Sequence, residues 1–273
     1  MFRQLAKKFL LAVPDVRRVI SERDSALAEV IRLHEKMGTQ REVIGQLEGQ
    51  RVPEHGKVVF SHWGEDSIAQ FIFREFKLGR YLDIGCYHPA LYSNTMSLYR
   101  QGWTGVNVDP NPFMIEQCRA LRPKDVSVNK AVGAERGFMD YFNFHDWASS
   151  NTANKKFAEE VAAVSQVDVP KPTSVEVMTL EDIINEYFKG TAPEFVNIDV
   201  EELDVDVLKS GNWEKQRPLV VAVEDIKFIA DRPGESPTYR FMRDHGYTLF
   251  SRCVFTSFFI EDGFNESAAN FPS

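Results

Sequence analysis

From residue 80 onward, short apolar runs alternate with amphipathic segments. The runs at 80–84, 105–109, 126–132, 194–199 and 219–224 have strand character, and the last is apolar at almost every position, as in a strand buried on both faces. Segments with one apolar face at helical spacing lie between them. These predicted helices cover 67–76, 93–100, 112–121, 180–188, a stretch ending near 208, and 237–245. Alternating strands and helices predict an α/β domain with a mostly parallel sheet.

Two parts of the pattern depart from this alternation. Near the C-terminus, the runs 247–250 and 254–260 are joined by 251–253 and predict an antiparallel ending. Farther upstream, strand-like runs at 137–144 and 175–178 enclose a polar stretch with a small helix predicted near 155–164. An excursion of this length between strands is commonly a lid or a substrate-binding loop.

Residues 1–50 have a pattern of their own. Apolar and basic side chains on different faces predict an amphipathic helix over 2–13, and residues 16–47 keep an approximate heptad that charged side chains interrupt. We predict an N-terminal helical, coiled-coil-like extension over 1–50, a linker over 51–60 and the main domain over 61–273. The extension indicates a homo-oligomer. The helix over 2–13 is predicted to pack on its own protein or a second subunit, and peripheral membrane contact is the alternative.

Composition narrows the class of protein. The 273 residues are 43% hydrophobic and carry a formal net charge of -8, which is typical of a soluble globular protein and argues against nucleic-acid binding. The widely spaced Cys86, Cys118 and Cys253 indicate neither a disulfide framework nor a cysteine-rich zinc site. No apolar run reaches the roughly 18–20 residues of a spanning helix. We expect a cytoplasmic protein, with the inner membrane surface as the alternative that residues 2–13 leave open.

Acidic residues and a glycine gather where the predicted strands end. Asp83 and Gly85 follow the first strand, Asp109 ends the second, and Asp199 and Glu201 follow the fourth. Ligands of an open parallel sheet bind beyond these strand ends, where glycine admits a close backbone approach and an acid accepts hydrogen bonds from ribose hydroxyls. The acids suit the ribose and amino-acid parts of S-adenosylmethionine. A dinucleotide-dependent dehydrogenase is a weaker alternative, because one glycine stands where dinucleotide folds have three.

A set of motifs from residue 61 to residue 260 resembles the FkbM family of S-adenosylmethionine-dependent methyltransferases. The resemblance implies an α/β class I methyltransferase fold: a Rossmann-like, seven-stranded, mostly parallel sheet with helices on both faces. It also implies methyl transfer to an oxygen. One position departs from the family pattern, since Glu202 stands where a glycine is usual. The motifs are Gly64-Glu65-Asp66, Leu82-Asp83-Ile84-Gly85, Ser93-Asn94-Thr95, Gly102-Trp103, Val108-Asp109-Pro110-Asn111-Pro112, Val177-Met178-Thr179-Leu180-Glu181-Asp182 and Asn197-Ile198-Asp199-Val200-Glu201.

The resemblance also implies which residues surround the cofactor, S-adenosylmethionine. Asp83 and Gly85 would line its methionine side, and Asp109 would hold the ribose. The adenine would be bordered by Asn111 or by the edge formed by Ala131 and Val132.

Methyl transfer to a hydroxyl needs a base for the hydroxyl proton. Asp199, Glu201, His88 and His145 are the candidates, and Asp199 comes first because its strand end is predicted beside the cofactor. The alternative for His88 is a turn residue ordered by the following proline. Acids from 199 to 206 could bind a divalent metal, but those beyond 203 are predicted on a solvated helix face and histidine ligands are missing, so we expect no metal.

The polar excursion holds candidates for binding the acceptor. His145, Trp147, Ser149 and Asn151 could offer amide, hydroxyl and aromatic partners to a sugar, or could form a polar surface loop that caps the next helix. The resemblance implies an acceptor hydroxyl on a saccharide, a glycoconjugate or a related natural product, and a place in polysaccharide biosynthesis. The alternative is a non-catalytic scaffold of the same fold that binds a partner in a glycan-assembly complex.

Overall fold

The computed structural model describes residues 58–264. By its internal contacts the chain divides into two units, Met1–Val58 and Val59–Ser273, and all the elements described below belong to the second unit. The helices and the coiled-coil-like extension predicted for residues 1–50 lie outside the described residues. Between residues 58 and 264, no helix has the length and apolar character needed to cross a bilayer.

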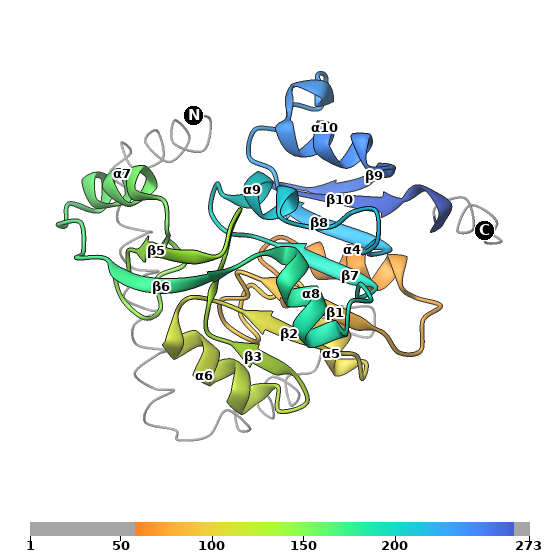
Figure 1. Cartoon of the computed structure of the whole chain (residues 1–273), viewed down its shortest axis with the longest axis horizontal. Coiled ribbons are helices and arrows are strands. Elements are labelled where there is room, and N and C mark those ends of the chain that lie inside the picture. Colours follow the sequence, from red (N-terminus) through yellow and green to blue (C-terminus); the bar gives the residue numbers. More distant parts are fainter. Residues whose placement is uncertain (1–57, 265–273) are drawn as a thin grey trace. The chain divides into compact units, whose positions relative to one another are not determined.

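A seven-stranded sheet forms the centre of the domain, in the order β3-β2-β1-β7-β8-β10-β9 (Figure 1). Neighbouring strands from β3 to β8 pair in parallel, and β10 pairs antiparallel with both β8 and β9. The carboxyl ends of β2, β1, β7 and β8 therefore meet at one edge. This confirms the predicted mostly parallel sheet. The strands are β1 Arg80–Ile84, β2 Thr104–Val108, β3 Val126–Val128, β7 Phe195–Ile198, β8 Val220–Glu224, β9 Tyr247–Cys253 and β10 Thr256–Glu261.

Helices cover both faces of this sheet (Figure 1). Helices α4 (Glu65–Ile72) and α5 (Met96–Arg100) pack on one face through a buried cluster that includes Trp103. Helices α8 (Leu180–Phe188), α9 (Asp204–Lys209) and α10 (Pro237–Asp244) pack on the other. Helix α6 (Pro112–Leu121) lies along β2 and β3.

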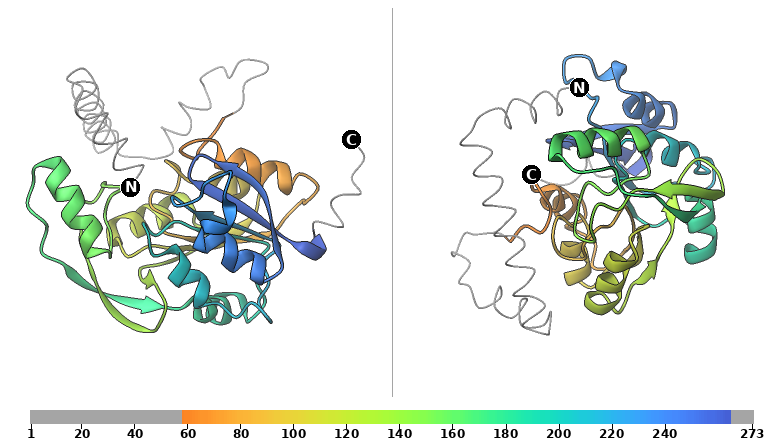
Figure 2. Two further views of the ribbon diagram at one scale, coloured as in Figure 1. Left: turned by 90° about the horizontal axis from the view of Figure 1, so that it is seen from above. Right: turned by 90° about the vertical axis from the view of Figure 1, so that its left-hand side faces the viewer.

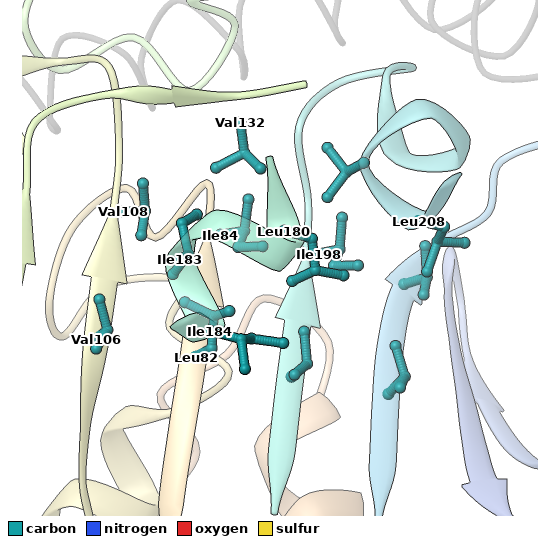
Figure 3. Close-up of a cluster of buried hydrophobic side chains, with 14 of the residues drawn as sticks. Leu82, Ile84, Val106, Val108, Val132, Leu180, Ile183, Ile184, Ile198 and Leu208 are labelled. Carbon is teal, nitrogen blue, oxygen red and sulfur yellow. The ribbon is translucent and has the colours of Figure 1, made fainter. Parts of the chain in front are cut away.

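The larger apolar cluster lies under α8, α9 and α10 (Figure 3). Strand residues such as Leu82, Ile84 and Ile198 meet Ile183 and Ile184 of α8, and all five are at most 1% exposed. Since a fully buried aliphatic side chain contributes roughly 1.5–3 kcal/mol, this cluster is a main source of the domain's stability.

Local sequence signals start α6 and α8 where they were predicted, whereas α4 begins at Glu65 and α5 at Met96 instead of at 67 and 93. Asn111 caps α6, because its Oδ1 accepts a hydrogen bond from the Phe113 amide at 3.0 Å, and Pro112 follows at the first helical position. Thr179 and Asp182 form a capping box at the start of α8. Helix α6 and helix α8 have the predicted bounds for this reason.

A small three-stranded sheet, in the order β4-β6-β5, stands to one side of the central sheet together with α7 (Figure 2). The prediction of one strand over 126–132 was therefore wrong: the chain turns at Asn129, whose Nδ2 donates to the carbonyls of Asp109 and Pro110 at 3.0 Å. The residues before this turn join the central sheet as β3, and those after it join the small sheet as β4. The added elements are β4 Ala131–Val132, β5 Gly137–Tyr141, α7 Lys155–Ser165 and β6 Thr173–Met178.

The antiparallel ending is confirmed, although its turn is not where the pattern put it. Strand β9 continues to Cys253, which pairs with Thr256, and the reversal takes place at Val254 and Phe255 rather than over 251–253. Val254 has a φ of 48°, the left-handed backbone that a two-residue hairpin turn requires. A short 3-10 helix, η1 (Pro233–Glu235), precedes α10.

Candidate active site

The turn after β1 requires glycine at residue 85. Gly85 has a φ of +73°, and a Cβ atom there would lie 1.8 Å from the carbonyl oxygen of Asp199. The amides of Gly85 and Cys86 both donate to the Val108 carbonyl, at 2.9 and 3.2 Å. The turn is thus held between the ends of β2 and β7, and a side chain at this position has no room. Glycine at this position therefore lets the turn pack closely against the backbone that follows β7.

Asp109, directly after β2, presents a buried carboxylate beside this turn. Its oxygens accept hydrogen bonds from the amides of Tyr87 (2.9 Å) and Asn111 (2.8 Å), and the residue is 7% exposed. Burial raises the pKa of Asp109 to about 6, against the lowering effect of these two amides. A carboxylate oxygen can accept more than one hydrogen bond. The geometry is therefore compatible with ribose hydroxyls at Asp109, and this role stays a prediction.

Asp83 lies below the turn, in a buried polar layer. Its carboxylate accepts hydrogen bonds from Thr95 Oγ1 at 2.5 Å and from Asn197 Nδ2 at 2.9 Å. Asn107 and Asn197 are its register partners on β2 and β7, so the three side chains form a row across the sheet. Burial raises the pKa of Asp83, while the nearby Arg122 guanidinium and the two hydrogen bonds oppose the rise. The carboxylate thus links β1, which leads into the turn at Gly85 (called the cofactor turn below), to β7 and to Thr95 at the start of α5.

Arg122, which follows α6, covers this layer and is 1% exposed. Its Nη1 donates to Thr95 Oγ1 (2.7 Å) and Asn107 Oδ1 (3.1 Å). Its Nε donates to the Pro89 carbonyl at 3.0 Å and its Nη2 to Ser93 Oγ at 2.6 Å. Arg122 thereby fastens the loop after the cofactor turn to the sheet. The sequence carries no signal for this role, because a basic residue at the end of a helix is usually solvated.

His88 orders its own turn. Its Nδ1 accepts hydrogen bonds from the amides of Ala90 (3.1 Å) and Leu91 (3.0 Å), and the residue is buried. A nitrogen that accepts carries no proton, so the proton of the neutral ring lies on Nε2. This arrangement leaves no basic nitrogen for a substrate hydroxyl. The geometry favours the turn-residue alternative over the catalytic role predicted for His88.

Trp147 attaches the polar excursion to the cofactor turn. Its carbonyl accepts a hydrogen bond from the Tyr87 hydroxyl at 2.8 Å, and its ring stacks on His88 at 5.5 Å and meets the edge of Phe113 at 5.1 Å. Beside it, Asn111 Nδ2 donates to the Asp146 carbonyl at 2.8 Å. Trp147 and Asn111 are both committed to this attachment, so neither side chain is a free surface for sugar or adenine.

The other residues predicted for the acceptor lie farther along the excursion. Asn151 uses its amide within the loop: Oδ1 accepts from the Phe144 amide and Nδ2 donates to the His145 carbonyl, both at 2.8 Å. The side chains of His145 and Ser149 are exposed. The structure thus gives Asn151 a loop-ordering part, and leaves acceptor binding by His145 and Ser149 as a prediction.

Ala131 and Val132 form β4 and pair with Val177 and Met178 of β6. Both residues are buried, and Val132 belongs to the apolar cluster (Figure 3). A border on the adenine at this edge would have to come from the backbone of β4.

Carboxyl groups gather after β7. The Asp199 amide donates to the Ile84 carbonyl at 3.0 Å, which holds this end beside the cofactor turn. Asp204 Oδ1 accepts from the Val200 amide at 3.1 Å. Burial raises the pKa of Asp204 well above its usual range, and the nearby charges of Asp199 and Glu201 add to the rise. The solvated position predicted for Asp204 was wrong, because this carboxyl folds back to cap its own turn.

The same turn explains the departure from the family pattern. Glu201 and Glu202 have φ values of 53° and 76°, in the left-handed region that favours glycine. Glu202 therefore adopts a left-handed backbone conformation that a glycine would adopt at a lower cost in free energy. In the part of the chain that the structure covers, no group of three or more acidic, histidine or cysteine side chains is placed to hold a metal ion.

The sheet order, the glycine turn and the acids at the strand ends together define a class I methyltransferase. The buried Asp109 carboxylate beside the glycine turn suits the ribose of S-adenosylmethionine, so the residues present fit this cofactor. A profile of the methyltransferase FkbM domain matches residues 83–249, more than half of the chain. The chain belongs to the FkbM methyltransferase family, and its cofactor is S-adenosylmethionine.

Solved structures of methyltransferases match the chain at low identity and low TM-score. The methyltransferase FkbM from Methylobacillus flagellatus KT is 11% identical with a TM-score of 0.42, and the alignment covers 67% of this chain but 44% of that one. A TehB-like SAM-dependent methyltransferase from Corynebacterium glutamicum ATCC 13032 Kitasato is 11% identical with a TM-score of 0.38, over 81% of this chain and 97% of that one. No curated protein matches the chain. Nothing about the acceptor follows from either likeness.

Proposed function

We propose that this protein is an O-methyltransferase that acts on a hydroxyl of a saccharide or glycoconjugate. The observation that carries the methyl-transfer part is the buried Asp109 carboxylate beside the Gly85 turn, in a chain of the FkbM family. The proposal of a saccharide acceptor is supported by the sequence motifs that resemble the FkbM family, because that resemblance implies such an acceptor.

The reaction needs few groups from the protein. When bound, S-adenosylmethionine supplies an electrophilic methyl group. The acceptor oxygen forms a bond to this carbon as the carbon–sulfur bond breaks, and the hydroxyl proton passes to a base, so that S-adenosylhomocysteine and the methyl ether leave. Positioning of the two reactants supplies much of the rate.

Asp199 is our proposed base. It follows β7 and is half-buried, and its carbonyl lies against Gly85 in the cofactor turn. Glu201 is the second candidate for the base. It lies in the same turn as Asp199, and the charges of both residues add to the raised pKa of Asp204. His88 is not proposed, since its Nδ1 is used in its own turn.

The test is transfer from methyl-labelled S-adenosylmethionine to a broad array of saccharides. We expect label in a saccharide with the unmodified chain, and a loss of kcat in Asp199→Asn with unchanged affinity for S-adenosylhomocysteine. Folded protein that binds S-adenosylhomocysteine but labels no saccharide would contradict the proposed acceptor. Protein that does not bind S-adenosylhomocysteine would favour the non-catalytic scaffold.

We further propose a cytoplasmic protein that forms a homo-oligomer through residues 1–50, with membrane contact by residues 2–13 as the alternative. The support is the amphipathic and heptad pattern of this segment. Deletion of residues 1–50 is expected to lower the mass in solution. An unchanged mass would contradict the oligomer, and sedimentation of the full chain with anionic vesicles would support the membrane alternative.

A further inference from the structure

Four aromatic side chains form a continuous row that begins at the cofactor turn, and we call this row the aromatic ridge. The Tyr87 ring stacks on Tyr92 with centroids 6.2 Å apart. Tyr92 meets His62 at 4.5 Å, and His62 stacks on Trp63 at 4.4 Å. The row joins the loop after β1 to the segment before α4, which are separate in sequence.

The ridge is exposed at its outer part. Trp63 is 53% and Tyr92 45% exposed, and His62 is exposed as well. Tyr87 and Tyr92 also have left-handed backbone, with φ values of 48° and 59°. Such backbone costs a non-glycine residue roughly 1–2 kcal/mol. Two large side chains are therefore held in costly positions that align their rings, and strain of this kind concentrates at functional sites.

Each end of the ridge is tied to a carboxylate. At the inner end, the Tyr87 amide donates to Asp109 at 2.9 Å. At the outer end, the Trp63 amide donates to Glu65 Oε2 at 2.8 Å, and the Trp63 carbonyl accepts from Cys253 Sγ at 3.2 Å, near the end of β9. The ridge thus leads from the cofactor turn towards the far side of the same sheet edge, and its border is acidic.

We propose that the aromatic ridge is the acceptor subsite, and that it binds a neutral or amino sugar on the outer face of Trp63 and along the ring edges of His62 and Tyr92. This inference rests on the proposed function and names its substrate class more closely. His62 stacks on one face of Trp63, and the other face can cover the apolar face of a sugar ring, while the indole N–H and the polar ring edges of the row offer partners to its hydroxyls. The carboxylates at both ends disfavour acidic saccharides, which would bring like charges together.

Two other occupants fit the ridge less well. The cofactor has its own place at the Gly85 turn and Asp109, which contact only the inner end of the ridge. A protein partner is marked by a broad apolar patch. In the ridge, by contrast, each ring carries a polar atom. Trp147, the plate suggested by the sequence, is half-buried, whereas Trp63 is exposed.

The experiment compares Trp63→Ala and Tyr92→Ala with the unmodified full chain on the saccharide array, with labelled S-adenosylmethionine as methyl donor. The matched control is Phe138→Ala, since Phe138 is 75% exposed on β5, outside the ridge. We expect kcat/KM for the labelled saccharide to fall about tenfold in each ridge variant, mainly through KM, because a stacking contact contributes about that much. Affinity for S-adenosylhomocysteine should stay the same, and Phe138→Ala should match the unmodified chain.

Each other result overturns the inference in a distinguishable way. If a saccharide is labelled and both ridge variants match the unmodified chain, the ridge is not the acceptor subsite, and the proposed function stands. If the chain binds S-adenosylhomocysteine but labels no saccharide on the array, both fail. If the ridge variants lose S-adenosylhomocysteine affinity as much as transfer, the ridge supports the cofactor turn instead. If acidic saccharides are the best acceptors, the charge argument is wrong.

Discussion

The two faces of the central sheet differ most at the level of the strand ends. Under α8, α9 and α10, this level is apolar, with side chains such as Ile84 and Ile198 buried in the larger cluster (Figure 3). On the opposite face, the same level carries Asn107 and Asp83 under the guanidinium of Arg122. Residues next to each other in β1 thus belong to an apolar face and a polar one.

This difference separates stability from positioning. Apolar burial is non-directional, so the α8 face stabilises the sheet without determining where a loop lies. Hydrogen bonds are directional, and a buried polar layer is costly unless all its members are satisfied. The polar layer is the one beneath the cofactor turn. It fixes Thr95, Pro89 and Ser93, which hold the loop that carries the site.

The largest effect is expected for Arg122→Ala, which breaks the polar layer. It removes the guanidinium from its buried ion pair with Asp125 and from the neighbourhood of Asp83, and removing one partner of a buried pair costs about 3–5 kcal/mol. Denaturation by urea should show this loss, and titration should show weakened binding of S-adenosylhomocysteine. Arg122→Lys keeps the charge without the planar fork. It should retain more stability but still bind S-adenosylhomocysteine less tightly, and full binding in both variants would contradict the positioning role.

Ile184→Ala tests the apolar face in the same assays. Ile184 is 1% exposed in the larger cluster, and a cavity there should cost about 3 kcal/mol of unfolding free energy. Under conditions where the variant is folded, its affinity for S-adenosylhomocysteine should equal that of the unmodified chain. A loss of affinity as large as that of Arg122→Lys would remove the distinction between the two faces.

Asp109 gives the third effect, through pH. Ribose hydroxyls donate to the ionised carboxylate, so affinity for S-adenosylhomocysteine should fall about tenfold per pH unit below the Asp109 pKa of about 6. Asp109→Asn should bind weakly with no such dependence. Folding raises this pKa from about 3.9, so the free protein should lose stability from this group as pH rises from 4 through 6. Calorimetric titration with S-adenosylhomocysteine between pH 5 and 8 tests this dependence. An affinity of the unmodified chain that does not change with pH would contradict the ribose role of Asp109.

The smallest effect is a gain of stability at the β7 turn. Glu202→Gly should relieve left-handed backbone worth about 1 kcal/mol and raise the melting temperature by about 2–4 °C. Lys189→Gly is the matched control, because Lys189 ends α8 with a φ of 56°. Both variants should be stabilised to a similar extent. A lower melting temperature for Glu202→Gly alone would show that the Glu202 side chain makes a stabilising contact that outweighs the strain.

Several elements could be predicted closely because local signals define them. Strand β1 and helices α6 and α8 have the predicted bounds, since Gly79 precedes the first and Pro112 and Thr179 open the other two. The run 126–132 could not be divided in the same way. An apolar run looks alike whether it forms one strand or contributes to two sheets, and the division depends on hydrogen bonds from Asn129 to distant carbonyls.

The residues of the candidate site likewise fall into two groups: those predicted from local sequence and those placed only by the tertiary structure. By itself the sequence determined that Gly85 and Asp109 follow two successive strands of the chain, because strand period and turn chemistry are local properties. Tertiary structure alone decided that Arg122 covers Asp83, that Trp147 is packed between His88 and Phe113, and that His62 and Trp63 extend the row from Tyr87. Which partner a buried polar or aromatic group meets depends on how distant segments approach. The local pattern of apolar and polar residues does not determine which distant segments meet.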